Sequence, residues 1–418
     1  MNHAMQAVSL LLASMFQGRH PDRLRSSFMF AGPGEPIALA RMGTEVNYDS
    51  KALLQAALYV RRHGSPHLRS LSMDEVNSRL KRFISDHYYL LAEQAFGVRF
   101  SCSYDEHLSA DTKERLANAA GASALFVEPR QIVLFPLIPI ASDAAFDSSR
   151  FFICSPPALA DQLTAHQVHT DLVPDSFPPV REWDGIRHSP TSWLGVEAPT
   201  LDAAKQIRAA VLGAVALLPH RSERYMFSGR KMFGGYTSFD DRCTISFGDP
   251  HTPPLMESLV LDASDREWLS VLAEKLVSPS NEHRRQMRAL EYYYRAWAPD
   301  PVKRFPTLFA AIDAIFGDAS QATQAVVDAV GPVMGPEYTS ERIRLILRLR
   351  ASVIHGGAPN VYESSKYEEY YSTYERDPVR DFELIVARCL QQVVFPAVMS
   401  ERPHTHADLI FQHTGKVV

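Results

Sequence analysis

The strongest structural signal in the chain lies at residues 340–357, which read SERIRLILRLRASVIHGG. Apolar residues recur there every three or four positions, and this spacing predicts a helix with one buried face. A serine at the start is a favourable N-cap, and Gly356-Gly357 is a favourable stop, so the helix is expected to run to His355. Arg350 falls within the apolar stripe, whereas His355 falls on the opposite, polar face.

Further helices are predicted on both sides of this segment. Residues 305–317 carry a continuous apolar stripe that ends at Gly317, and Asp377-Pro378 is a favourable cap and first turn for a helix over 378–395. With a short helix near 323–330, these segments are enough for one compact bundle. We therefore expect residues 281–418 to form an all-α domain.

The first 280 residues mix helical and strand patterns, which predicts an α+β N-terminal region in a multi-domain protein. Proline clusters put a boundary near residue 180, separating an α+β domain (1–180) from a second α+β subdomain or connector (181–280). The elements expected in 1–180 are a helix over 74–96 after Ser72 and strands at 124–127 and 132–135. Those expected in 181–280 are a helix over 201–218, strands at 244–247 and 258–261, and a helix after Ser264.

Composition narrows the class of protein. The chain has 418 residues, of which 46% are apolar and 22% charged, so it can build globular cores. Its net charge of -5 gives no general basic field, and any RNA site must therefore be a local patch. Four cysteines without a Cys-x-x-Cys pair suggest buried, reduced thiols and a cytoplasmic location. The apolar run 7–16 is too short to cross a bilayer, and no phosphate-binding glycine loop is present.

Arg350 and His355 together have the chemistry needed to cleave RNA without a metal. Such cleavage requires a base that takes the 2′-OH proton near neutral pH, and a cation that stabilises charge on the phosphate. Histidine suits the first role and the planar arginine fork suits the second. Residues five apart on a helix point about 140° away from each other, so a site shared between two chains would bring the two roles together more easily.

Three phrases in this region resemble the Apea-like branch of the HEPN family. They are ALEYYYRAW at 289–297, FAAIDAIF at 309–316 and RASVIHG at 350–356, and they occur in the family's order. The last phrase contains the family's Arg-x-x-x-x-His motif. The resemblance implies a metal-independent endoribonuclease without cofactors, which acts on RNA such as tRNA or mRNA and leaves a 2′,3′-cyclic phosphate.

The resemblance also implies a homodimer with a composite site, in a toxin or an antiviral, abortive-infection effector. Residues 1–280 would then sense a trigger, either phage-derived or a small molecule. The family's first helix carries an acidic residue at the position of Asp313, which we expect to pair with an arginine of the motif helix. Arg348 fits a looser family spacing and is a second candidate for phosphate contact.

One departure from the family motif keeps an alternative open. The family has a small polar residue directly after the arginine, whereas this chain has Ala351, with Ser352 one place later as a supporting candidate. The alternative is a catalytically inactive HEPN protein that serves dimerisation, RNA binding or partner binding.

Other polar clusters in the chain have both a functional and a simpler structural explanation. Arg284, Arg285, Arg288 and Arg344 could follow an RNA backbone, although a solvated helix face also accounts for them. The tyrosines of 362–374 could stack bases, but the interleaved glutamates favour a surface loop. The C-terminal His404, His406, Asp408 and His413 lack a fixed ligand pattern, so no metal site is expected.

Overall fold

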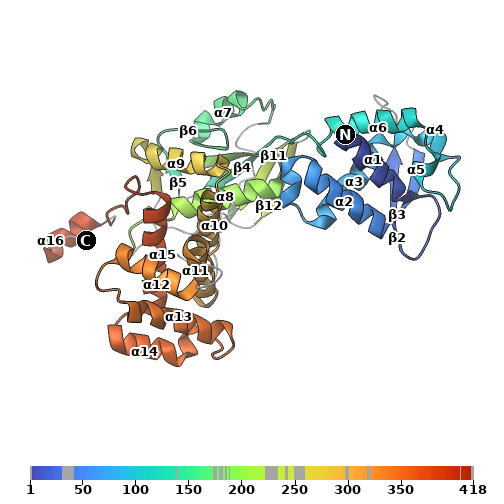
Figure 1. The fold of residues 1–418 in the computed structure, drawn as a ribbon. Helices are drawn as coiled ribbons and strands as arrows, with labels where there is room; N and C mark the ends of the chain where they lie inside the picture. Colours follow the sequence, from blue (N-terminus) through green and yellow to red (C-terminus); the bar gives the residue numbers. More distant parts are fainter. Residues whose placement is uncertain are drawn as a thin grey trace. The chain divides into compact units, whose positions relative to one another are not determined.

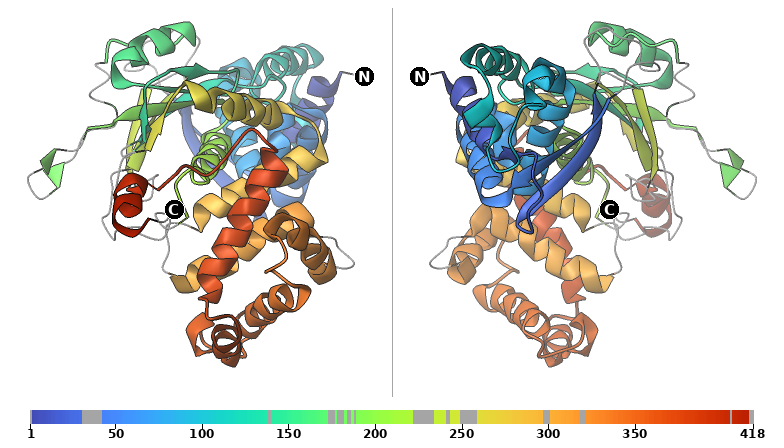
Figure 2. Two further views of the ribbon diagram at one scale, coloured as in Figure 1. Left: turned by 90° about the vertical axis from the view of Figure 1, so that its left-hand side faces the viewer. Right: turned by 90° about the vertical axis from the view of Figure 1, so that its right-hand side faces the viewer.

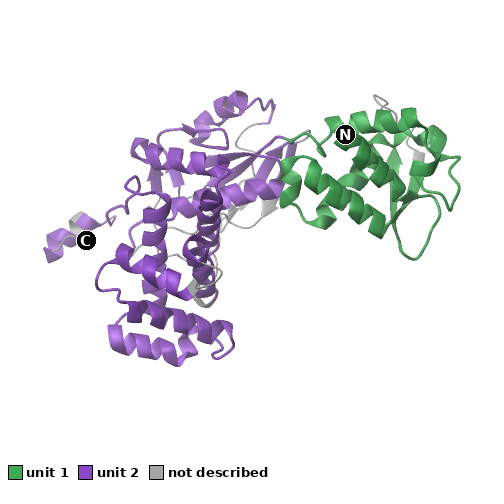
Figure 3. Cartoon of the chain, in the orientation of Figure 1, with its two compact units in different colours: residues 1–129 green, residues 130–418 purple. Residues whose placement is uncertain are grey.

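The computed structural model describes residues 2–30, 42–137, 140–172, 177, 182–183, 186–187, 189–221, 234–240, 243–248, 259–296, 301–317, 322–404 and 406–415. The chain divides into two compact units, Met1–Pro129 and Arg130–Val418 (Figure 3). Each unit contains helices and sheet, so the expected mixed α+β character is present. The boundaries that we expected near residues 180 and 280 do not coincide with this division.

Unit 1, residues 1–129, joins helices to a three-stranded antiparallel sheet of order β1-β3-β2. The apolar run 7–16 supplies the buried face of its first helix. The elements of this unit are α1 (His3–Ala13), β1 (Met15–Phe16), β2 (Arg23–Phe30), β3 (Met42–Asp49), α2 (Ser50–His63), η1 (Pro66–Ser70), α3 (Met73–His87), η2 (Tyr88–Leu90), α4 (Ala92–Ala95), α5 (Tyr104–His107) and α6 (Ala110–Ala122).

Unit 1 confirms one of the predicted element boundaries and contradicts a predicted strand. α3 begins after Ser72, as predicted, and Ser72 caps it in a full capping box with Glu75, but this helix ends at His87, well before residue 96. The strand predicted at 124–127 is wrong, because the backbone N–H groups of Phe126 and Val127 both donate to the Ser123 carbonyl in a turn after α6. A short apolar run has no period of its own, and the tertiary environment decides its conformation.

Unit 2, residues 130–418, is built on a six-stranded antiparallel sheet of order β12-β11-β4-β10-β7-β6 (Figure 1). The predicted strands at 132–135, 244–247 and 259–261 are confirmed, and residue 258 lies outside the described residues. The elements up to the last strand are β4 (Gln131–Leu137), β5 (Ile140–Ser142), β6 (Phe146–Asp147), β7 (Phe151–Cys154), η3 (Pro156–Ala158), α7 (Leu159–Ala165), β8 (Glu182–Trp183), β9 (Ile186–Arg187), β10 (Ser192–Ala198), α8 (Leu201–Val215), β11 (Gly234–Phe239), β12 (Cys243–Gly248) and β13 (Leu259–Leu261).

The sheet of unit 2 is buried on both faces of its central strand. In β4, Val133 and Phe135 belong to the large core shared with α8 and the C-terminal helices. Ile132 and Leu134 belong to a smaller cluster that includes Leu159 of α7. Successive residues of a strand point to opposite faces, so β4 reads as an unbroken apolar run.

The C-terminal helices confirm the predicted helical segments. After η6 (Ala263–Asp265) they are α9 (Arg266–Val277), α10 (Asn281–Arg295), α11 (Pro301–Phe316), α12 (Ala322–Met334), α13 (Ser340–Ile354), η7 (Val361–Glu363), α14 (Ser365–Tyr374), α15 (Pro378–Val394) and α16 (Ala407–Thr414). The segment 362–374, expected as a surface loop, is largely the helix α14. Within unit 2, α13 and α14 lie at the end remote from the sheet (Figures 1 and 2).

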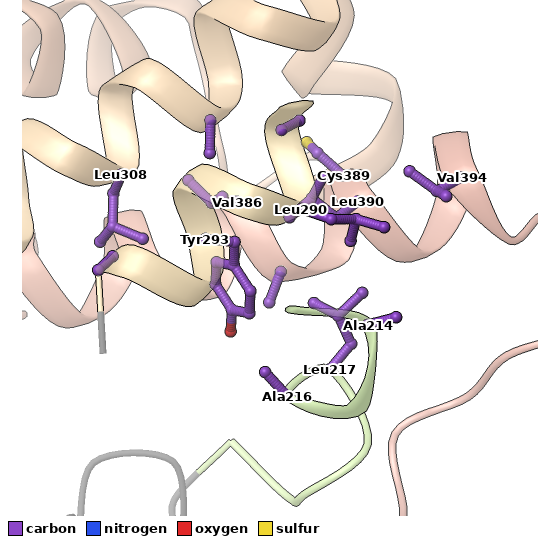
Figure 4. Close-up of a cluster of buried hydrophobic side chains, with 14 of the residues drawn as sticks. Ala214, Ala216, Leu217, Leu290, Tyr293, Leu308, Val386, Cys389, Leu390 and Val394 are labelled. Atoms are coloured by element: carbon purple, nitrogen blue, oxygen red, sulfur yellow. The ribbon is translucent and has the colours of Figure 1, made fainter. Parts of the chain in front are cut away.

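The helices and the sheet of unit 2 share one core. Figure 4 shows Ala214 and Leu217, at the end of α8 and just after it, beside Leu290 of α10 and Leu390 of α15, all fully buried. α8 and α10 approach so closely that a Cβ on Gly213 would lie 2.2 Å from the Leu290 carbonyl oxygen. The expected helical domain is therefore packed directly onto the α+β portion.

The cysteines correct one further expectation. Cys154 and Cys389 are buried free thiols, as predicted, and burial raises the pKa of each to about 12. Cys243 is exposed and Cys102 is partly exposed. Cys243 is the first residue of β12, which is an edge strand of the sheet, and this position leaves its side chain exposed.

Unit 1 should lose stability at mildly acidic pH because of His67. This side chain is buried, its Nε2 has no hydrogen-bond partner among the residues that the structure describes, and burial lowers its pKa from 6.5 to about 4. Below pH 6.5 the unfolded chain takes up a proton that the folded chain refuses, so stability falls as the pH drops towards 4. Relative to His67→Gln, the wild type should lose roughly 2 kcal/mol between pH 7 and pH 5.

Urea unfolding followed by far-UV circular dichroism measures this difference. All four tryptophans follow residue 130, so their fluorescence reports on unit 2 and supplies an internal control. An equal pH dependence in wild type and His67→Gln would contradict the assignment.

Candidate functional site

The motif helix α13 ends where the sequence predicted. The Thr339 side chain, one residue before the serine that we expected as the N-cap, caps its first turn. His355 is the C-cap residue, with its N–H donating to the Ala351 carbonyl. Gly356 follows with φ +74°, a left-handed conformation that favours glycine and terminates the helix. His355 is exposed, and so are Arg344 and Arg348, which agrees with the predicted polar face.

Arg350 is oriented by the neighbouring helix α11. Its Nη2 lies 2.8 Å from Asp313 Oδ2, and its guanidinium carbon lies 5.0 Å from the centroid of the Phe309 ring. The predicted pairing of Asp313 with an arginine of the motif helix is confirmed. Both side chains keep about a third of their surface exposed, so this ion pair adds little stability and mainly fixes direction.

Ser352 holds the end of α13 to the start of α14. Its hydroxyl donates to the Leu349 carbonyl and lies 2.7 Å from the hydroxyl of Ser364, the N-cap of α14. The N–H of Ala358 closes the turn by donating to the Ser352 carbonyl. The observed contacts of Ser352 are thus those of a residue that shapes the helix end.

The exposed arginines of α13 contact different neighbours. Arg348 Nη2 lies 3.8 Å from Glu369 Oε1 on α14, and Arg344 Nη2 donates to Gln324 Oε1 on α12 at 3.1 Å. The hydrogen bond from Lys366 lowers the pKa of Glu369, so this carboxylate is ionised beside Arg348. Among the described residues, no hydrogen bond or ion pair joins Arg350 to His355.

Arg342, which sequence analysis did not single out, anchors the motif helix. Its side chain is buried, pairs with buried Asp381 of α15 and donates from Nε to the Tyr370 hydroxyl at 2.8 Å. Tyr370 in turn donates to the same carboxylate at 2.6 Å. Burial raises the pKa of Tyr370, and the hydrogen bond to Asp381 raises it further. The network joins α13, α14 and α15 in the bundle interior.

The arginines of α10 that we considered as RNA contacts differ in their partners. Arg285 donates to the carbonyls of Ala314 and Gly317, at 2.8 and 2.6 Å, and so caps the C-terminus of α11. Arg288 pairs with Glu291 at 2.6 Å, and Arg284 is exposed. Arg285 therefore has a structural contact that the sequence did not reveal, since its partners lie about thirty residues away.

The C-terminal histidines do not assemble a metal site in the described part of the chain. His404 and His406 have ring centroids 5.9 Å apart, and the side chain of Asp408 lies outside the described residues. No group of three or more histidine, cysteine, aspartate or glutamate side chains that could hold a metal ion occurs among the residues that the structure describes.

Comparisons with known proteins yield no relative. No family model, no curated protein and no solved structure matches this chain. Among the described helices, none is both long enough and apolar enough to cross a lipid bilayer. The site must therefore be judged on its own geometry.

Removing Arg342 should destabilise unit 2 much more than removing a surface arginine of the same helix. Arg342→Leu leaves the buried Asp381 carboxylate without its cation, at a cost of about 3–5 kcal/mol. The double variant Arg342→Leu/Asp381→Leu should recover most of that loss. The matched control Arg344→Leu, on the exposed face, should change stability by roughly 0.5 kcal/mol or less.

Chemical unfolding monitored by tryptophan fluorescence suits this measurement, because Trp268 packs edge-on against Phe395 at the end of α15. Equal losses for the two single variants would mean that the Arg342 network does not hold the bundle together.

Proposed function

We propose that this protein is a metal-independent endoribonuclease whose reaction centre combines Arg350 and His355 from two copies of the chain. The observation that carries the proposal is the partly exposed guanidinium of Arg350, oriented by Asp313, on a helix that ends in an exposed histidine. The order of the three sequence phrases that resemble the HEPN family adds to it. The protein would act in the cytoplasm.

The proposed reaction needs only these two kinds of side chain. His355 takes the proton of a ribose 2′-OH, and the 2′ oxygen attacks the adjacent phosphorus. Arg350 stabilises the negative charge that develops on the phosphate oxygens. The bond to the 5′ oxygen breaks, and that oxygen takes up a proton from water or from a histidine of the second copy. The products are a 2′,3′-cyclic phosphate and a 5′-OH end.

Arg350 can contact a phosphate without losing Asp313. The ion pair uses Nη2, and a guanidinium carries five N–H donors, so donors remain for phosphate oxygens. Helix geometry separates the directions of Arg350 and His355 by about 140°, which favours a site shared between two chains. Ile354 is half exposed beside His355, and a second copy would cover this apolar side chain.

The biological role follows from the same proposal. An RNase that cuts tRNA or mRNA arrests growth, which fits a toxin or an abortive-infection defence protein. Such an enzyme requires restraint, and we assign this role to the N-terminal region, with a phage-derived or small-molecule trigger.

A second candidate function is a HEPN-like protein without catalytic activity that serves dimerisation or partner binding. Ala351 favours it, because the position after the motif arginine carries no polar group. The contacts of Ser352 favour it too, since its hydroxyl is engaged by Leu349 and Ser364. The cleavage experiment separates the two candidates.

Purified protein incubated with total RNA or tRNA in EDTA should generate 2′,3′-cyclic phosphate ends. Loss of the base in His355→Ala should slow cleavage by about a hundredfold or more, and Arg350→Ala should do the same by removing the charge on the phosphate contact. Arg380→Ala provides the matched control, because Arg380 is an exposed arginine on α15 outside the proposed site. Its rate should equal that of the wild type.

If the purified protein needs a trigger for activity, the same variants can be expressed in cells that contain the trigger, and growth arrest is measured there. The nuclease proposal would be contradicted if growth arrest persisted in the double variant Arg350→Ala/His355→Ala, or if both single variants still cleaved RNA. The non-catalytic candidate would then be favoured.

A further inference from the structure

A hollow of about 250 Å³ lies between α8, α9 and α10, within unit 2. Its lining combines cationic side chains with an apolar wall. The cations are Lys275 of α9 and Arg284 and Arg288 of α10. Two of these were candidates for RNA contact in the sequence, where nothing indicated that they share a hollow with Lys275.

Positive charge is in excess around this hollow. Lys275 Nζ donates to two uncharged acceptors, Gln286 Oε1 at 2.8 Å and the Val394 carbonyl at 2.5 Å, and burial lowers its pKa. Among the residues that the structure describes, the Arg284 side chain has one hydrogen bond, from Nη2 to the Asn281 amide oxygen at 3.5 Å. The carboxylate in the lining is Glu291, which Arg288 shares with Arg295. An anion in the hollow would therefore gain charge-assisted hydrogen bonds.

One more carboxylate lies close by and lowers the excess of positive charge without cancelling it. Glu282 acts on Lys275 electrostatically, but its Oε1 accepts a hydrogen bond from Gln286. Counting it, Lys275 and the arginines at 284, 288 and 295 face two carboxylates, so two positive charges remain in excess.

Most of the uncharged lining of the hollow is apolar and firmly placed, and Gln206 and Ser278 are its uncharged polar members. This apolar part, called the apolar wall below, consists of Ile207, Leu276 and Met287, which pack onto the main core, and of the small side chains of Ala203 and Ala210. The close approach of α8 to α10 at Gly213 fixes the separation of the two helices that carry most of this wall, and Leu276 of α9 completes it. Concave, largely pre-formed apolar surface with a few placed polar groups is the usual form of a small-molecule site.

We propose that this hollow binds a small amphipathic anion, that is, a compact apolar body bearing one carboxylate or phosphate group. The anionic group meets Lys275 and Arg284, while the apolar body lies on Ile207 and Met287. A nucleic-acid backbone is less suited to the same place, because its phosphates would use the cations and leave the apolar wall uncovered. The site is independent of RNA cleavage and of the second copy of the chain.

The test is calorimetric titration of the full-length protein with three probes. Octanoate carries both a tail and a charge, 1-octanol carries the tail alone, and inorganic phosphate carries the charge alone. The proposal expects octanoate to bind about tenfold more tightly than 1-octanol, since one charge-assisted hydrogen bond is worth at least that factor. It expects a similar, roughly tenfold advantage over phosphate, since burial of about two methylene groups of the tail is worth that factor.

Variants then assign the site. Lys275→Met and Arg284→Gln should each weaken octanoate binding by about tenfold and leave 1-octanol unchanged. Arg284 is exposed, so Arg284→Gln keeps the test decisive if Lys275→Met fails to fold. Arg380→Gln on α15, an exposed arginine away from the hollow, should bind octanoate as the wild type does.

Several outcomes would overturn the proposal. Octanoate that binds no more tightly than 1-octanol would show that the cations do not contribute. Phosphate that binds as tightly as octanoate would indicate a simple anion site. Competition by a short single-stranded RNA, lost together with octanoate binding in Arg284→Gln, would assign the cations to RNA instead.

Discussion

The close packing of α8 on α10 is the constraint from which the rest of unit 2 follows. α8 packs against the sheet through β10 and β4, and α10 packs against α11 and α15. A Cβ on Gly213 would collide with the backbone of Leu290, so the two helices can pack this closely only because α8 has a glycine there. Through this contact the sheet core and the helical core become one cluster of buried residues. The same contact sets the walls of the hollow that contains Lys275.

The motif helix depends on a second, polar constraint at the far end of the bundle. Buried Arg342 joins α13 to Asp381 of α15 and Tyr370 of α14, and stacking on Tyr338, with the guanidinium carbon 4.2 Å from the ring centroid, completes its surroundings. Such a network is tolerated in a core only when its polar groups find partners. With α13 held in this way, Arg350 meets Asp313 of α11 at the bundle surface.

Three arginines of the same helix, α13, therefore differ in burial and in the contacts that they make. Arg342 is a core residue, Arg350 is an oriented, partly exposed cation, and Arg348 is a surface residue opposite Glu369. Helical periodicity separated Arg348 from Arg350 correctly, because it assigns a face to each residue. It could not identify Arg342, because the partner that makes its burial tolerable is thirty-nine positions away in the sequence.

The sequence by itself determined four helices of the C-terminal third (α11, α12, α13 and α15), the start of α3 after Ser72, two strands of the larger sheet (β4 and β12) and the helix face to which each motif residue belongs. These features rest on interactions between residues a few positions apart, which periodicity and capping rules describe. It also suggested the pairing of Asp313 with an arginine of the motif helix. Only the tertiary structure decided that 124–127 is a turn, that 365–374 is a helix, that the bundle shares its core with the sheet, and that Lys275 joins Arg284 and Arg288. Those outcomes depend on contacts between segments that are distant in the sequence. The burial and the local charge that such contacts create cannot be derived from a pattern of a few neighbouring residues.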